Sequence, residues 1–106
     1  MNHPDGLGIA VQPVDVKGGT KKIRLVLVEW VDSHASRGWV TPADLARAAE
    51  PLYCCSVGWL LHDKSNCKVM VPHMAGAKGG DTTQVCGDLT IPTKSIVRIT
   101  ALGKRR

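Results

Sequence analysis

Apolar residues are most concentrated over residues 23–31, where nearly every position is apolar and several side chains are β-branched. Such a run is typical of a strand that is buried on both faces or passes from one layer into another. The polar segment 32–38 begins with Asp and ends with Gly, which predicts a loop. We expect extended structure to resume at Trp39 and Val40.

A short helix is predicted next by several independent signals. Thr41 can cap it, Pro42 suits the first helical position, and Asp44 completes a pattern like a capping box. Residues 45–49 have high helix propensity, and Pro51 ends the segment. The helix should have only two to three turns.

The pattern then changes to that of strands. Val57, Trp59 and Leu61 alternate with polar or small residues, which predicts a strand with one buried face. Residues 63–66 form a good turn, and the alternation over residues 67–71 completes a hairpin. Trp59 is expected in the core.

The last third of the chain predicts a hairpin tip and two more strands. Residues 75–83 are too rich in Gly to pack, so we expect a protruding surface loop there. Residues 85–91 form a strand candidate in which Gly87 permits a bend, and residues 95–102 form the final strand.

This order of elements predicts a mainly β fold: a small antiparallel barrel of the Sm or SH3 type, with about five strands and one short helix. Closure into a barrel removes most unpaired strand edges. A chain of 106 residues supports one core, which we assign to residues 21–103. Residues 1–20 are expected to form a flexible N-terminal arm, and residues 104–106 a basic tail.

The net charge of +5 at first suggests a nucleic-acid-binding protein, but most of it lies at the two ends. Residues 1–22 carry three Lys and two Asp, and residues 104–106 carry three more basic side chains. The remaining residues, 23–103, carry eight basic and seven acidic side chains. Binding to an extended duplex is therefore disfavoured, whereas a small anionic ligand needs only two or three cations.

Several short motifs resemble a set of small uncharacterised proteins of tailed bacteriophages. They are Glu-Trp-Val-Asp at 29–32, Gly-Trp at 38–39, Val-Gly-Trp-Leu at 57–60, and Leu-Thr-Ile-Pro at 89–92, followed by Ile96, Ile99 and Leu102. The last part also resembles the Sm-like barrel. The resemblance implies a homo-oligomer, such as a ring, that binds RNA or sequesters a nucleotide signal of host defence. The chain lacks the Asp/Asn and Arg-Gly loop motifs of RNA-binding Sm proteins.

Metal binding and catalysis have little support in the sequence. Zinc would need ligands from among Cys54, Cys55, Cys67, Cys86, His62 and His73, yet no Cys-x-x-Cys pair exists. We expect packed, reduced thiols, no metal and no cofactor. Cys86 with either His62 or His73 could form a nucleophile–base pair, but nothing in the local sequence distinguishes these residues from scattered surface histidines. We therefore predict that the protein is not an enzyme.

The tryptophans carry nearly all the aromatic surface, because the chain has no Phe and one Tyr. Stacking on a base and packing in the core are both open to Trp30 and Trp39, which flank the loop. We predict non-enzymatic binding of a nucleotide or short single-stranded nucleic acid at subunit interfaces. The candidate ligand-binding residues are Trp30, Asp32, Arg37, Trp39, Lys78, Thr90 and Lys94.

Two other functions remain open: inhibition of a host protein by direct binding, and an accessory role in assembly without a small ligand. No apolar run is long enough to span a membrane and no signal-peptide pattern is present, so we expect no membrane partner and a location in the cytoplasm of the bacterial host cell.

Overall fold

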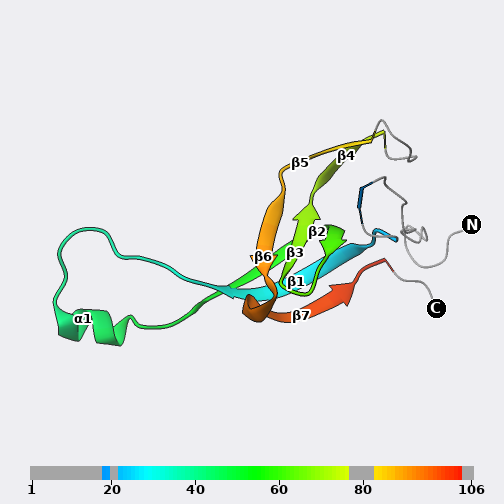
Figure 1. Ribbon diagram of the computed structural model, residues 1–106. Helices are drawn as coiled ribbons and strands as arrows, with labels where there is room; N and C mark the ends of the chain where they lie inside the picture. The colour runs from blue at the N-terminus through cyan, green and yellow to red at the C-terminus, as the bar shows by residue number, and fades with distance from the viewer. Residues whose placement is uncertain (1–17, 20–21, 77–82, 104–106) are drawn as a thin grey trace, which may run out of the picture.

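The computed structural model describes residues 18–19, 22–76 and 83–103. Most of the predicted N-terminal arm, the basic tail and Lys78 lie outside these residues. The described part is mainly β, as predicted, with one short α-helix (Figure 1). Seven strands are assigned there: β1 Leu25–Asp32, β2 Leu52–Asp63, β3 Cys67–Val71, β4 His73–Ala75, β5 Gln84–Cys86, β6 Leu89–Pro92 and β7 Ile96–Ala101.

Five of these strands form one antiparallel sheet in the order β6-β3-β2-β1-β7. β1 lies between β2 and β7 and pairs with β2 along its whole length, from Leu25 opposite Trp59 to Asp32 opposite Leu52. The predicted hairpin of β2 and β3 is confirmed. The last strand returns across the sheet to pair with the first, so that Val28 lies opposite Ile99.

The core lies on the face of the sheet that carries alternate residues of β1. Val28 and Ile91 are almost completely buried there, with Val26 and Met70 beside them. Gly58 lies opposite Val26, and a Cβ atom at Gly58 would lie 3.0 Å from the carbonyl oxygen of Val71. Glycine thus permits the close approach of β2 and β3 at this point.

The connection between the two edge strands requires the sheet to curl. A three-residue 3-10 turn, η1 (Thr93–Ser95), joins the end of β6 to the start of β7. Four Cα steps span at most about 15 Å. In a flat sheet, four strand spacings would separate the edges by about 19 Å. No ladder between β6 and β7 is found among the described residues, so the predicted closure into a barrel is not found.

The predicted strand over residues 85–91 is divided in two. β5 pairs with β4 in a separate two-stranded sheet, whereas β6 pairs with β3. Gly87 lies between them with a positive φ of 82°, which is the bend that the sequence predicted. The tip of the predicted hairpin, residues 77–82, lies outside the described residues.

Two local predictions were wrong. Trp39 and Val40 do not form a strand, because no neighbouring strand is there to pair with them. Val57 does not share a buried face with Leu61: Val57 is exposed, and the pairing shifts between Leu60 and His62. Trp59 and Leu61 do share a cluster, since Trp59 packs against Leu61, Ile23 and Val71.

Candidate functional site: a protruding finger

The segment between β1 and β2, residues 33–51, projects away from the sheet, and we call it the finger (Figure 1). Every residue of the finger is exposed. It carries the helix α1 (Pro42–Arg47), none of whose side chains is buried. Leu45 is the one large apolar residue of α1, so the helix has no apolar stripe with which to pack on the core.

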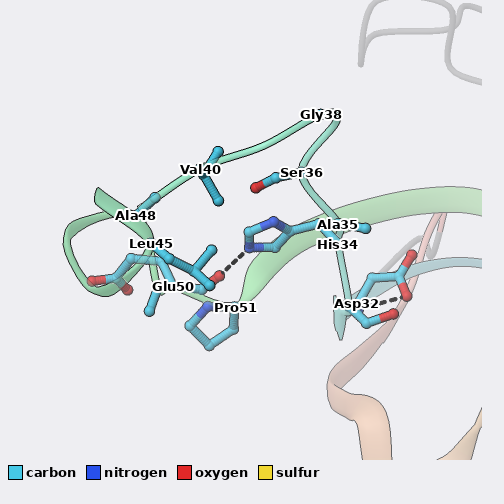
Figure 2. Close-up of a pocket in the computed structure, with 12 residues that line it drawn as sticks. Asp32, His34, Ala35, Ser36, Gly38, Val40, Leu45, Ala48, Glu50 and Pro51 are labelled. Atoms are coloured by element: carbon cyan, nitrogen blue, oxygen red, sulfur yellow. Dashed lines mark hydrogen bonds between the residues drawn. The ribbon is translucent and has the colours of Figure 1, made fainter. Parts of the chain in front are cut away.

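The finger is held by local contacts. The hydroxyl Oγ1 of Thr41 accepts a hydrogen bond of 3.1 Å from the backbone N–H of Asp44, which confirms the predicted N-cap. Arg47 pairs with Asp44 one turn away. At the base, Nε2 of His34 lies 2.5 Å from the backbone carbonyl oxygen of Glu50 and joins the two sides of the finger (Figure 2).

The two sides of the finger enclose an open groove of about 640 Å³. This volume lies within the roughly 300–1,000 Å³ range of ligand-sized sites. Its described walls are Asp32, Ser33, His34, Ala35, Ser36, Gly38, Val40, Leu45, Ala48, Ala49, Glu50 and Pro51 (Figure 2). None of them is Lys or Arg, and two are carboxylates. The groove therefore suits an apolar or cationic group better than an anion.

Large apolar side chains without cover gather on and beside the finger. Trp39 is fully exposed (102%), and the exposed fractions of Val40 and Leu45 are 48% and 50%. Leu52 and Tyr53, at the start of β2, are exposed as well. Burial of a Trp side chain contributes about 4–6 kcal/mol at the usual value per unit area. An exposed aromatic side chain with exposed aliphatic residues near it in sequence is typical of an interaction surface.

Trp30 packs on the core of the sheet. It lies on β1, is half-buried, and packs against the core cluster of Val28 and Ile91. Its indole Nε1 donates a hydrogen bond of 3.0 Å to the hydroxyl of Ser56 on β2. These contacts assign Trp30 to the core, the alternative that the sequence left open.

The structure does not bring the other candidate ligand-binding residues together in one site. Asp32 lines the groove, and its Oδ1 accepts a hydrogen bond from the backbone N–H of Ser33. Arg37 and Trp39 lie on the finger but do not line the groove. The remaining described candidates lie at the far edge strand and the following turn, Thr90 on β6 and Lys94 on η1.

The remaining chemistry of the described residues is sparse. All four cysteines are free, and no three His, Cys, Asp or Glu side chains gather there as a metal site. His73 and Cys86 face each other across β4 and β5. In the part of the chain that the structure describes, no third group of this kind joins them to orient the His of a catalytic triad.

Two ion pairs of the described residues lie outside the finger, Lys68 with Asp63 and Arg98 with Glu29. Nε of Arg98 on β7 donates to Glu29 on β1 at 2.6 Å, and a second guanidinium nitrogen donates at 3.2 Å. This hydrogen bonding lowers the pKa of Glu29 from its ordinary value. The pair links two neighbouring strands.

The exposure of the apolar residues Val40, Leu45 and Tyr53 was not predicted from the sequence. The sequence does contain a signal that the helix projects from the core. A segment that reads Pro-Ala-Asp-Leu-Ala-Arg over residues 42–47 has one large apolar side chain, too few to hold a helix on a core. A helix with good caps and no apolar stripe predicts a projecting element.

The chain matches no known protein family model, no curated protein and no solved structure. None of the helices in the described residues has both the length and the apolar character that a membrane crossing requires.

Proposed function

We propose that the protein acts without catalysis, by binding a protein surface through the finger. The observation that carries this proposal is the complete exposure of an element that displays Trp39, Val40 and Leu45. An aromatic anchor with aliphatic neighbours is the usual centre of a protein–protein interface. The curled sheet serves as the rigid body that holds the finger.

The charges of the finger also favour a protein partner. Residues 33–51 carry two Arg, one Asp and one Glu, so the net charge of the finger is zero. Recognition of nucleic acid would call for a surplus of cations at the contact. Nucleotide binding stays a prediction, and the two carboxylates of the groove do not favour it.

We propose further that the sheet is an opened barrel of the SH3 or Sm type. The support is its strand order, in which a meander of four strands is followed by a 3-10 turn and a last strand beside the first. The resemblance to tailed-phage proteins stays a prediction. On that resemblance, the partner is a host protein or a component of phage assembly.

Site-specific photo-crosslinking in the cells that express the protein tests the main proposal. A photoreactive amino acid replaces Arg37 on the finger, and in a matched control it replaces Lys64 in the turn between β2 and β3. Both positions are exposed, and both side chains are long and cationic. We expect a discrete protein adduct from position 37 and none from position 64.

The absence of an adduct at position 37, with full-length protein present and folded, would overturn the proposal. Adducts of equal yield from both positions would also contradict it, because they would reflect random collisions. Crosslinking to nucleic acid instead of protein would favour the nucleotide or nucleic-acid prediction.

A further inference from the structure

We propose that the surface bound by the finger is the finger of a second copy of this chain, with Trp39 of each copy inserted into the groove of the other. This inference rests on the proposed function and names the partner. The starting observation is that one segment of 19 residues carries a fully exposed aromatic side chain and most of the walls of a groove lined in part by apolar residues.

The anchor and the groove are close enough for reciprocal contact. Gly38 and Val40 both line the groove (Figure 2). Trp39 stands between them in the chain but does not line it. Its side chain is therefore free of its own groove. A two-fold axis that brings Trp39 of one copy to the groove of the other also brings the second Trp39 to the first groove, which is the arrangement of an isologous interface.

The groove has walls that suit an indole. Val40, Leu45, Ala48 and Pro51 supply apolar surface, and the volume of about 640 Å³ has ample room for the ring. The carbonyl oxygen of Glu50 already accepts a hydrogen bond from His34 within this groove. A carbonyl oxygen has a second lone pair, so an indole N–H can also find an acceptor there.

Charge complementarity favours a second copy over an unrelated surface. The groove carries the carboxylates of Asp32 and Glu50, and none of its described walls is Lys or Arg. The anchor has the opposite character, because Arg37 lies two residues from Trp39. When Trp39 enters the groove of a second copy, Arg37 approaches those two carboxylates. The same pairing occurs twice about the two-fold axis.

The size of the contact predicts a weak dimer. Two Trp side chains bury about 300–500 Å², and the walls that receive them bury a similar area. The total of about 600–1,000 Å² lies below the roughly 1,200 Å² of standard stable interfaces. We therefore expect a reversible dimer that forms in about the micromolar range.

Sedimentation equilibrium of the purified chain, measured from low micromolar to about millimolar concentration, tests the dimer. We expect a monomer–dimer equilibrium. Trp39→Ala removes both anchors and should weaken dimerisation by about 30-fold per contact, hence about 1,000-fold for the pair. Val97→Ala, which shortens an exposed side chain on β7, is the matched control and should leave the dissociation constant within about twofold.

A mixing experiment tests the reciprocal geometry. Ala48→Trp fills the groove while leaving Trp39 in place, so this variant alone should be monomeric, like Trp39→Ala. A mixture of the two variants restores one contact, because Trp39 of the Ala48→Trp chain can enter the open groove of the Trp39→Ala chain. We expect a heterodimer about 30-fold weaker than the native dimer. Since both changes are at exposed positions, unchanged urea midpoints verify that the sheet is intact.

The outcomes separate this inference from the proposed function. A native chain that stays monomeric throughout overturns the inference, as does a dimer that Trp39→Ala leaves unchanged. If the chain is monomeric and position 37 crosslinks to a different protein, the inference fails and the proposed function stands. If position 37 also gives no adduct, both fail. Variants that form no heterodimer on mixing overturn the reciprocal arrangement.

Discussion

The sheet and the finger are built by the same stretch of chain but are stabilised in opposite ways. β1 and β2 are paired along eight residues each and cover a core that includes Val28 and Ile91. Beyond Asp32 the chain leaves β1, runs through the finger and returns to the sheet at Leu52. No residue of the finger is buried, and its contacts are local. Local signals are therefore sufficient to shape a segment, whereas only long-range burial ties it to the cooperative unfolding of the protein.

Truncation of a core side chain should give the largest difference between the two regions. Ile91→Ala leaves a cavity at a site that is 1% exposed, so we expect a loss of about 2–5 kcal/mol in the free energy of unfolding. The matched change in the finger, Leu45→Ala, should cost less than about 0.5 kcal/mol when measured on the monomer. Urea unfolding at low protein concentration measures both. Equal losses would show that the finger belongs to the core.

Addition of a single methyl group to a glycine should give the second-largest difference in stability between the sheet and the finger. Gly58→Ala places a Cβ atom against the backbone of β3 and the side chain of Met70, which should cost about 1–3 kcal/mol. Gly38→Ala meets no atoms, but its positive φ of 74° strains the finger locally. We expect thermal unfolding to shift for Gly58→Ala and to stay unchanged for Gly38→Ala. A similar shift for both would contradict the independence of the finger.

Removal of one hydrogen-bond acceptor should have a smaller effect. Ser56→Ala leaves the half-buried indole N–H of Trp30 without its partner and should cost about 1 kcal/mol. Thr41→Ala, the corresponding change in the finger, removes the helix cap. It should lower the helical signal in circular dichroism and leave the urea midpoint of the sheet in place. A shift of that midpoint by Thr41→Ala would contradict this prediction, because it would show that the finger and the sheet unfold together.

The smallest expected effect concerns pH. Arg98 lowers the pKa of Glu29 in the folded protein, so the pair contributes stability above the ordinary pKa of 4.5 and loses it as the pH falls through the lowered value. The stability of the native protein should fall slightly further below about pH 4.5 than that of Glu29→Gln. High salt should diminish the difference, since the pair is exposed. Urea midpoints of the native protein and of Glu29→Gln at pH 7 and pH 3 measure this difference. Equal changes in the two midpoints would show that the Glu29–Arg98 pair contributes nothing to stability.

Much of the fold could be predicted from local pattern. The apolar run of β1, the cap at Thr41, the turn between β2 and β3 and the bend at Gly87 each depend on residues that are close in sequence. The exposure of Val57 and the division of the strand at Gly87 into two sheets could not be predicted, because they depend on which strand lies opposite.

The candidate site was predicted less well than the fold. The sequence placed Trp30 and Trp39 together because both flank the same polar loop. In the structure Trp30 packs in the core and Trp39 is fully exposed. The difference arises from tertiary position: Trp30 still has a paired strand beside it, whereas Trp39 lies beyond the last paired residues. Sequence distance to a loop does not reveal this boundary.

The pairing of the last strand with the first sets the timing of folding during synthesis. Val28 and Trp30 lie opposite Ile99 and Ile96, about 70 positions further along the chain. Until β7 emerges from the ribosome, one edge of β1 has no partner and part of its apolar surface is uncovered. The five-stranded sheet is therefore completed only after residues 96–101 have left the ribosome. A nascent chain that stalls before Ile96 would leave this edge of the apolar strand β1 unpaired and open to pairing with other chains.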